Sequence, residues 1–401
     1  MTPFLAVDPV ALIRSPLLLL LLLLPLVIIH ELGHFISAKA FRIKVLEFGV
    51  GFPPRIKRLA WRRGETEYTI NWLPIGGFVR LLGEEDPGDP RSLAAAAPWK
   101  RLIVIYAGVA INFVAAIALF SFGFMIPRER SLSLAQITFV EPGSPASEAL
   151  IEGTMQDGSD PLQGLQPGDI VLEAEGRDIA NTFELVYVNR LNLGETQEWV
   201  VKRGSSLLTA EVFARWDPPA GQGPTGVLIG SPSTCADVDD EGNGINCQLL
   251  YPFTESVQYF APWDTIPRGW QALVDNVVLT KNELQVRLGG GTDGASLNGG
   301  EGPIVNSPVG LAAATNEIVK EAGWRPLIEL AALLSLSLAV FNFLPIPALD
   351  GGRALFIWIE MIRGGKRISP EREGMIHFAG MVLLLAFIAF IMILDVERLI
   401  A

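Results

Sequence analysis

The chain has 401 residues, of which half are hydrophobic and only 18% are charged, and its mean hydropathy is +0.37. Soluble domains carry about a quarter charged residues, so this composition indicates a membrane protein with a soluble part and excludes intrinsic disorder. Two cysteines exclude a disulfide-rich scaffold, and a formal net charge of −12 argues against nucleic acid as a partner.

Four apolar segments are each close to the roughly 20 residues that a membrane-spanning helix needs. They cover about residues 16–40, 102–126, 326–343 and 376–394. A cleaved signal peptide is the alternative interpretation of the first segment. No small-residue cleavage site follows it, and it continues directly into polar residues, so a retained helix is favoured.

The charges are unevenly distributed along the chain. Basic residues gather in the segments 41–101 and 353–372, whereas the block 127–324 is acidic. The positive-inside rule predicts that both basic segments are cytoplasmic and that the acidic block lies outside.

An H-E-x-x-H motif stands at the end of the first apolar segment, formed by His30, Glu31 and His34. Residues four apart share a helix face, so the two imidazoles can hold one metal ion. Glu31 is then placed to take a proton from water activated by the metal. A chance match is the alternative, but ionisable residues are costly inside an apolar run, which favours a functional motif.

The cytoplasmic segment after this motif contains a predicted β-structure. Residues 66–74 are typical of a strand, and Gly76 and Gly77 lead into residues 78–82 as its predicted hairpin partner. An ordinary hairpin resting on the membrane is the alternative to a substrate-binding role. Asn112, a lone polar residue in the second segment, is expected to pack against a neighbouring helix.

A catalytic zinc site normally has a third protein ligand, and Asp350 is the best candidate. It follows the third apolar segment, after Pro345 and Pro347 break the helix. A helix C-terminal cap, with Gly351 and Gly352 forming a turn, is an equally good interpretation of this residue taken alone. His377, in the fourth segment, has no partner at ligand spacing and is expected to be structural.

The external block carries two further features. Cys235 and Cys247 flank an acidic loop, for which a disulfide is preferred to a calcium site because the late glutamate of an EF-hand is missing. Residues 288–304 are rich in glycine and are expected to be flexible.

Together the motifs resemble the site-2 protease family of intramembrane zinc metalloproteases, in particular its bacterial sigma-E regulator protease type. The resemblance rests on the H-E-x-x-H motif, on Asn342-x-x-Pro345-x-Pro347-x-Leu349-Asp350-Gly351, and on the patches 48–55, 74–83 and 308–310. It implies zinc held by His30, His34 and Asp350, with Glu31 as general base. It also implies that Asn342 holds substrate or stabilises the oxyanion.

The resemblance extends to a substrate-binding β-loop and to one inserted domain. In the family, the region around Gly76 and Gly77 offers a sheet edge to an extended substrate. Residues 132–232 resemble a circularly permuted PDZ domain, with a helix near 182–193. The strand bordering the peptide groove of that domain is expected at Gly226, Val227, Leu228 and Ile229. A spacer that binds no peptide is the alternative for the PDZ-like region.

The predicted fold is therefore a polytopic α-helical membrane protein with four transmembrane helices, a membrane-associated β-hairpin and an inserted β-rich PDZ-like domain. The predicted domains are a membrane core at 1–126, a PDZ-like domain at 127–260, an amphipathic and glycine-rich connector at 261–325, and the rest of the membrane core at 326–401.

The predicted function is zinc-dependent proteolysis within a bacterial inner membrane. The PDZ-like domain is expected outside the cytoplasm, and the active site is expected toward the cytoplasmic side of the membrane. By resemblance, the substrates are single-span membrane proteins such as anti-sigma factors, or signal-peptide remnants; membrane lipid is the other expected partner. A non-catalytic membrane PDZ scaffold is one alternative, and a zinc enzyme acting on a soluble peptide or lipid is another. Glu31 argues against the scaffold.

Overall fold

The computed structural model describes most of the chain, and the described part divides into two compact units. The described residues are 9–400 without 85, 157, 220, 232, 239–243, 250–253 and 289–307. A helical unit comprises Met1–Met125, Ala261–Leu273 and Val305–Ala401, and a β-rich unit comprises Ile126–Phe260 and Val274–Ile304.

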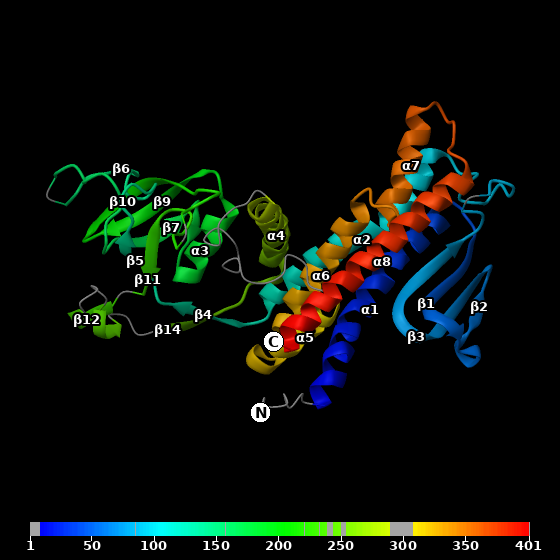
Figure 1. Cartoon of the computed structure of the whole chain (residues 1–401), viewed down its shortest axis with the longest axis horizontal. Helices are drawn as coiled ribbons and strands as arrows, with labels where there is room; N and C mark the ends of the chain where they lie inside the picture. Colours follow the sequence, from blue (N-terminus) through cyan, green and yellow to red (C-terminus); the bar gives the residue numbers. More distant parts are fainter. Residues whose placement is uncertain are drawn as a thin grey trace. The chain divides into compact units, whose positions relative to one another are not determined.

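Four helices of the described chain are long and apolar enough to cross a membrane, and they coincide with the four predicted spans (Figure 1). They are α1 (Pro9–Ala40), α2 (Pro98–Met125), α6 (Pro326–Phe343) and α8 (Pro370–Ile400). The helical unit also contains α5 (Pro308–Ala322) and α7 (Asp350–Ile362). The most apolar stretch of α8 contains no buried residue, as expected for a helix surrounded by lipid.

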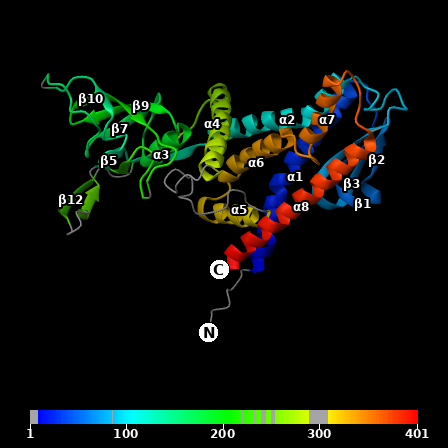
Figure 2. The ribbon, with the colours of Figure 1, turned by 45° about the horizontal axis from the view of Figure 1, so that its top comes forward.

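Helix α2 lies against α1, α6 and α7 (Figure 2). It approaches α1 very closely at Gly33, where an added Cβ would lie only 2.4 Å from the carbonyl oxygen of Ala107. Small residues at such a crossing allow two helix backbones to pack together in a membrane.

Two other parts of α2 hold the neighbouring helices. Ala116 and Phe120 form a buried cluster with Ala332 and Leu336 of α6. Toward the start of α2, Leu102 and Ile105 pack against Ala354 and Ile357 of α7. Next to this second cluster, the buried Arg101 guanidinium pairs with the Glu360 carboxylate at 2.7 Å.

A three-stranded sheet follows α1 and corrects the predicted hairpin. Its strands are β1 (Val45–Arg55), β2 (Trp61–Arg63) and β3 (Thr66–Leu81), with the short 3-10 helix Lys57–Leu59 between the first two. Residues 67–70 and 77–80 belong to one long strand, and both halves pair with residues 47–50 of β1. The two halves are therefore not hairpin partners, because β1 supplies the hydrogen bonds to each of them.

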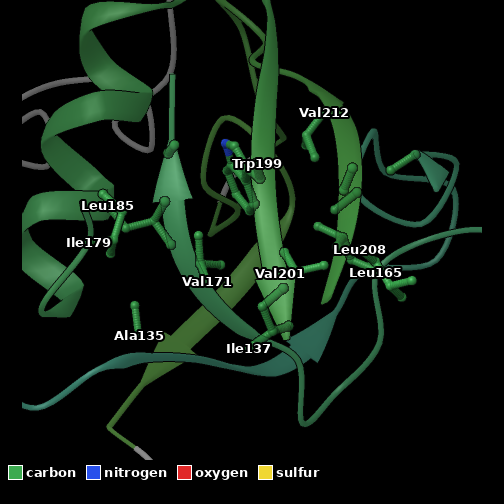
Figure 3. Packing of buried hydrophobic residues seen from close by; sticks show 14 of the residues in the cluster. Ala135, Ile137, Leu165, Val171, Ile179, Leu185, Trp199, Val201, Leu208 and Val212 are labelled. Carbon is green, nitrogen blue, oxygen red and sulfur yellow. The ribbon is translucent and has the colours of Figure 1, made fainter. Parts of the chain in front are cut away.

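The β-rich unit is built around one sheet, whose strands differ in length. The order of its strands is β11-β5-β7-β9-β10-β6, with β8 paired to β7. These strands are β5 (Ala135–Val140), β6 (Leu150–Glu152), β7 (Ile170–Ala174), β8 (Arg177–Asp178), β9 (Thr196–Arg203), β10 (Ser206–Phe213) and β11 (Val227–Gly230). Trp199 is fully buried in the core of this sheet, among residues that include Val201 and Ile137 (Figure 3).

Helix α3 (Thr182–Leu191) packs against β5 and β7. Its N-terminus is capped because the Asn181 side chain accepts a hydrogen bond from the Glu184 backbone N–H at 3.0 Å. The predicted helix near 182–193 is therefore present, and it ends two residues early.

Two strand pairs complete the β-rich unit. One joins β4 (Arg128–Leu132) to β14 (Thr254–Gln258), and the other joins β12 (Ser233–Val238) to β13 (Gly244–Leu249). Cys235 and Cys247 are directly opposite each other in the β12–β13 register. The disulfide stays a prediction, and the centre of the acidic loop, 239–243, lies outside the described residues, as does the glycine-rich segment from 289 on.

Helix α4 (Pro262–Leu288) contributes to both units. In the β-rich unit, the Asp275 carboxylate accepts two hydrogen bonds from the Arg177 guanidinium at 2.7 and 2.8 Å. The Tyr187 hydroxyl also donates to Asp275, at 3.1 Å. Burial and the nearby carboxylate raise the pKa of Tyr187, so its hydroxyl keeps the proton that it donates.

The α1–α2 crossing predicts different effects for two glycine-to-alanine changes. Gly33→Ala places a methyl group against the α2 backbone and should lower the unfolding free energy by about 1–3 kcal/mol. Gly374→Ala in α8 meets nothing within 4 Å and should raise it by up to about 1 kcal/mol through helix propensity. Thermal unfolding in detergent measures both, and equal effects would contradict the close crossing.

Candidate metal centre

Three side chains from distant parts of the sequence meet in the helical unit. His30 and His34 lie one turn apart on α1, and Asp350 is the first residue of α7. The Asp350 Oδ2 atom lies 2.9 Å from His30 Nε2 and 3.2 Å from His34 Nε2. The two Nε2 atoms are 3.2 Å apart. All three residues were predicted as metal ligands, and the fold brings them together.

The loop before α7 delivers Asp350 to this position. Helix α6 ends at Phe343, and Leu349 is the N-terminal cap residue of α7. The alternative interpretation of Asp350 as a helix C-terminal cap is therefore wrong, because Asp350 begins a helix. The loop folds tightly onto this helix start, since an added Cβ on Gly351 would lie 2.0 Å from the Leu344 carbonyl oxygen.

Helix α2 orients the His34 imidazole. His34 Nδ1 lies 2.8 Å from the carbonyl oxygen of Val104, which can only accept a hydrogen bond. Nδ1 therefore carries the proton, and Nε2 presents its lone pair to the other two ligand atoms. Gly108 leaves room for this arrangement, because an added Cβ there would lie 2.5 Å from His34 Nε2.

This donor set fits a zinc ion. Zinc at about 2.0–2.1 Å from tetrahedral ligands requires neighbouring ligand atoms about 3.3 Å apart, close to the separations of 2.9–3.2 Å found here. Two imidazole nitrogens and a carboxylate are also typical zinc ligands.

Asn112 of α2 is a partner of His30 that the sequence did not reveal. Its side chain is completely buried, and its Nδ2 lies 3.3 Å from His30 Nδ1. Its Oδ1 is buried and has no hydrogen-bond partner among the described residues. Turning the amide would let Oδ1 accept the Nδ1 proton that a His30 bound to metal through Nε2 must carry. The only sign of this role in the sequence was the presence of a lone polar residue within the second apolar segment.

Glu31 and Asn342 line a cavity of about 190 Å³ together with His30 and Asp350. Gly77 of β3 lies beside Glu31, since an added Cβ would be 3.4 Å from Glu31 Cγ. The structure thus brings Gly77 to the predicted base, whereas the neighbouring Gly76 faces the Phe52 ring. The other predicted substrate residues, 226–229, belong to the β-rich unit, at and just before edge strand β11.

The contact between Asn112 and His30 predicts a metal-binding defect. Asn112→Leu keeps the branching and the number of side-chain heavy atoms but removes the acceptor, and should weaken zinc binding by about 10–100-fold. Asn112→Asp keeps an acceptor and should bind zinc much more tightly than the leucine variant. Competition with a chromophoric chelator measures both affinities. Wild-type affinity in Asn112→Leu would refute the contact.

Comparison with known proteins agrees with this site. Residues 18–387 match the family model described as peptidase family M50. A relative from Clostridium perfringens, which carries the name of a zinc metalloprotease, is 30% identical over 375 residues, covering 92% of this chain and 95% of the relative. Zinc metalloprotease RasP of Oceanobacillus iheyensis is 25% identical over 459 residues, covering 93% of this chain and 96% of RasP.

The family match covers most of the chain, and the relatives align over nearly their whole length. The chain therefore belongs to peptidase family M50, the site-2 protease family, and is a multi-pass membrane zinc metalloprotease.

Proposed function

We propose that this protease cleaves single-span membrane proteins in or near their transmembrane segments. The observation that carries this proposal is the position of its reactive groups. His30 and Glu31 lie inside the membrane-spanning stretch of α1, and Asn342 lies in that of α6. A soluble substrate has no need for a site at that depth, where polar groups are costly.

Each side chain of the site has a distinct role in hydrolysis. His30, His34 and Asp350 hold the metal. Zinc, when bound, polarises the scissile carbonyl and lowers the pKa of the attacking water. Glu31 lines the same cavity, takes the proton from that water and passes it to the leaving amine.

Asn342 faces the cavity from the last turn of α6. Its Nδ2 now donates to the Leu338 carbonyl oxygen at 2.9 Å, within its own helix. A rotation about its side-chain bonds would release this donor toward a substrate carbonyl. Its role is therefore to bind the substrate backbone or to stabilise the developing negative charge.

Strand β3 would hold the substrate in an extended form. Residues 77–81 pair with β1 on one side, and no described strand pairs with their other edge. Gly77 on this strand lies beside Glu31. A substrate segment that adds to this edge replaces the hydrogen bonds that it loses on leaving its helix, and it passes the base as it does so.

The β-rich unit would recognise or filter the external part of the substrate. Strand β11 is at one end of the sheet order and pairs only with β5 among the described strands. Residues Gly226, Val227, Leu228 and Ile229 therefore offer an edge for a peptide, as in a PDZ domain. A size filter that binds no peptide is the alternative for this unit.

We infer the orientation in the membrane from the distribution of charges. Basic residues in 41–101 and 353–372 support a cytoplasmic position for the sheet and for α7, with the acidic β-rich unit outside. We place the protein in a bacterial cell membrane, with anti-sigma factors or signal-peptide remnants as substrate classes. A non-catalytic scaffold is not favoured, because it needs no base beside two metal ligands.

Loss of the base should abolish cleavage without loss of the metal. Glu31→Gln removes the proton acceptor and should lower kcat by about 10²–10⁴-fold, while zinc content stays near one ion per chain because Glu31 is not a ligand. The measurement is cleavage of a purified single-span protein in detergent, with zinc content determined on the same samples.

The control for this measurement is a chelator, followed by the return of zinc. Activity should disappear with the chelator and come back with zinc in the wild type only. Cleavage that survives Glu31→Gln would show that another residue is the base. Faster cleavage of a soluble peptide than of the membrane-spanning substrate would refute the intramembrane function and leave the protease.

A further inference from the structure

The turn that precedes Asp350 has an unfavourable backbone conformation. Ala348 has φ of +79°, in the left-handed region that residues other than glycine seldom adopt. Such a conformation persists only where surrounding contacts hold it. The position of the Asp350 carboxylate depends on this turn, and therefore on the contact that holds Ala348.

Helix α8 supplies that contact through His377. The backbone N–H of Ala348 donates a hydrogen bond to His377 Nδ1 at 2.9 Å. One turn further along α8, Gly380 packs directly on the loop, since an added Cβ would lie 2.3 Å from Pro347 Cβ. Helix α8 is thus fitted to two consecutive residues of the loop, at positions three residues apart on one helix face.

The turn also separates two cavities. Ala348 and Asp350 line the cavity of about 190 Å³ that contains Glu31, and they also line a second cavity of about 420 Å³. His377 and Arg353 are on the wall of the second one. Within the turn, the Leu349 N–H donates to the Ile346 carbonyl oxygen at 3.1 Å, whereas the hydrogen bond from Ala348 to His377 ties the turn to another helix.

We propose that His377 is a positioning residue for the metal centre. By accepting the Ala348 N–H, it holds the turn in the conformation that places the Asp350 carboxylate against His30 and His34. This inference rests on the proposed metal site and assigns to α8 a function beyond spanning the membrane. His377 was expected to be only structural, because its sequence neighbours contain no ligand.

A purely structural role for His377 makes a different prediction. Its ring also packs on Phe356, with ring centroids 5.3 Å apart, and its Nε2 lies 4.0 Å from a Glu373 oxygen. If packing were its only role, any flat ring of similar size would replace it. If it acts as an acceptor, a smaller side chain with an oxygen at the same distance from the backbone would replace it better.

Two substitutions separate these roles. His377→Phe keeps the ring and removes the acceptor, and should weaken zinc binding by about 10–100-fold, as loss of an outer partner of a metal ligand does. His377→Asn loses the ring but keeps an acceptor at the δ position, and should bind zinc nearly as well as the wild type. Leu383→Ala, on the exposed side of α8, is the control and should change nothing.

A third substitution tests the route through Ala348. Glycine adopts positive φ freely, so Ala348→Gly should recover most of the zinc affinity that His377→Phe loses. The measurement is zinc affinity in detergent by chelator competition, together with the absorption spectrum of bound cobalt, which reports ligand geometry without any substrate. If His377→Phe alone does not fold, the double variant should fold and bind zinc.

Several results would overturn the proposal. These are wild-type zinc affinity in His377→Phe, an equal loss in His377→Phe and His377→Asn, or no recovery with Ala348→Gly. A double variant that also fails to fold would do the same. Failure of the proposed function is distinguishable, because the wild-type protein itself would then bind no zinc or cleave no substrate.

Discussion

Three potential metal-ligand atoms converge in the helical unit, and the arrangement around them depends on that convergence. The Nε2 atoms of His30 and His34 and the Asp350 carboxylate oxygen lie within 3.2 Å of one another. A proton shared between these atoms or a bound cation can bridge them, so zinc would take the place of a proton. Metal binding and the stability of this part of the fold are therefore coupled.

Helix α2 is the element that makes the convergence possible. Val104, Gly108 and Asn112 are four residues apart and share one face of the helix. Their contacts run in the opposite order along α1, since Val104 meets His34 and Asn112 meets His30. One helix face thus orients both histidines, while the start of the same helix anchors α7 and hence Asp350.

Hydrolysis in a membrane requires polar groups and water where lipid normally excludes them. The site meets this requirement by confining its polar side chains to a small cavity between α1, α6 and the loop before α7. Strand β3 approaches the same site at Gly77, where an added Cβ would lie 3.4 Å from Glu31 Cγ. The β-rich unit folds around its own core, and none of its described residues belongs to the candidate metal site.

The sequence by itself determined the four spans and the metal-binding helix face of His30 and His34, and it offered Asp350 as the candidate for a third ligand. Long apolar runs and i, i+4 spacing express local chemistry, which a sequence displays directly. Residues 66–82 were predicted as strand, but their pairing was wrong, because β1 from earlier in the chain lies between the two halves of β3.

Only the tertiary structure decided which interpretation of Asp350 holds and which polar residues support it. Asn112 and His377 each seemed to lack a chemical role, since their partners, His30 and Ala348, are distant in sequence. A hydrogen bond between two helices depends on their register and rotation, and these are fixed by packing at small residues such as Gly33 and Gly380. No local pattern encodes that geometry, so the ligands were predictable and their supports were not.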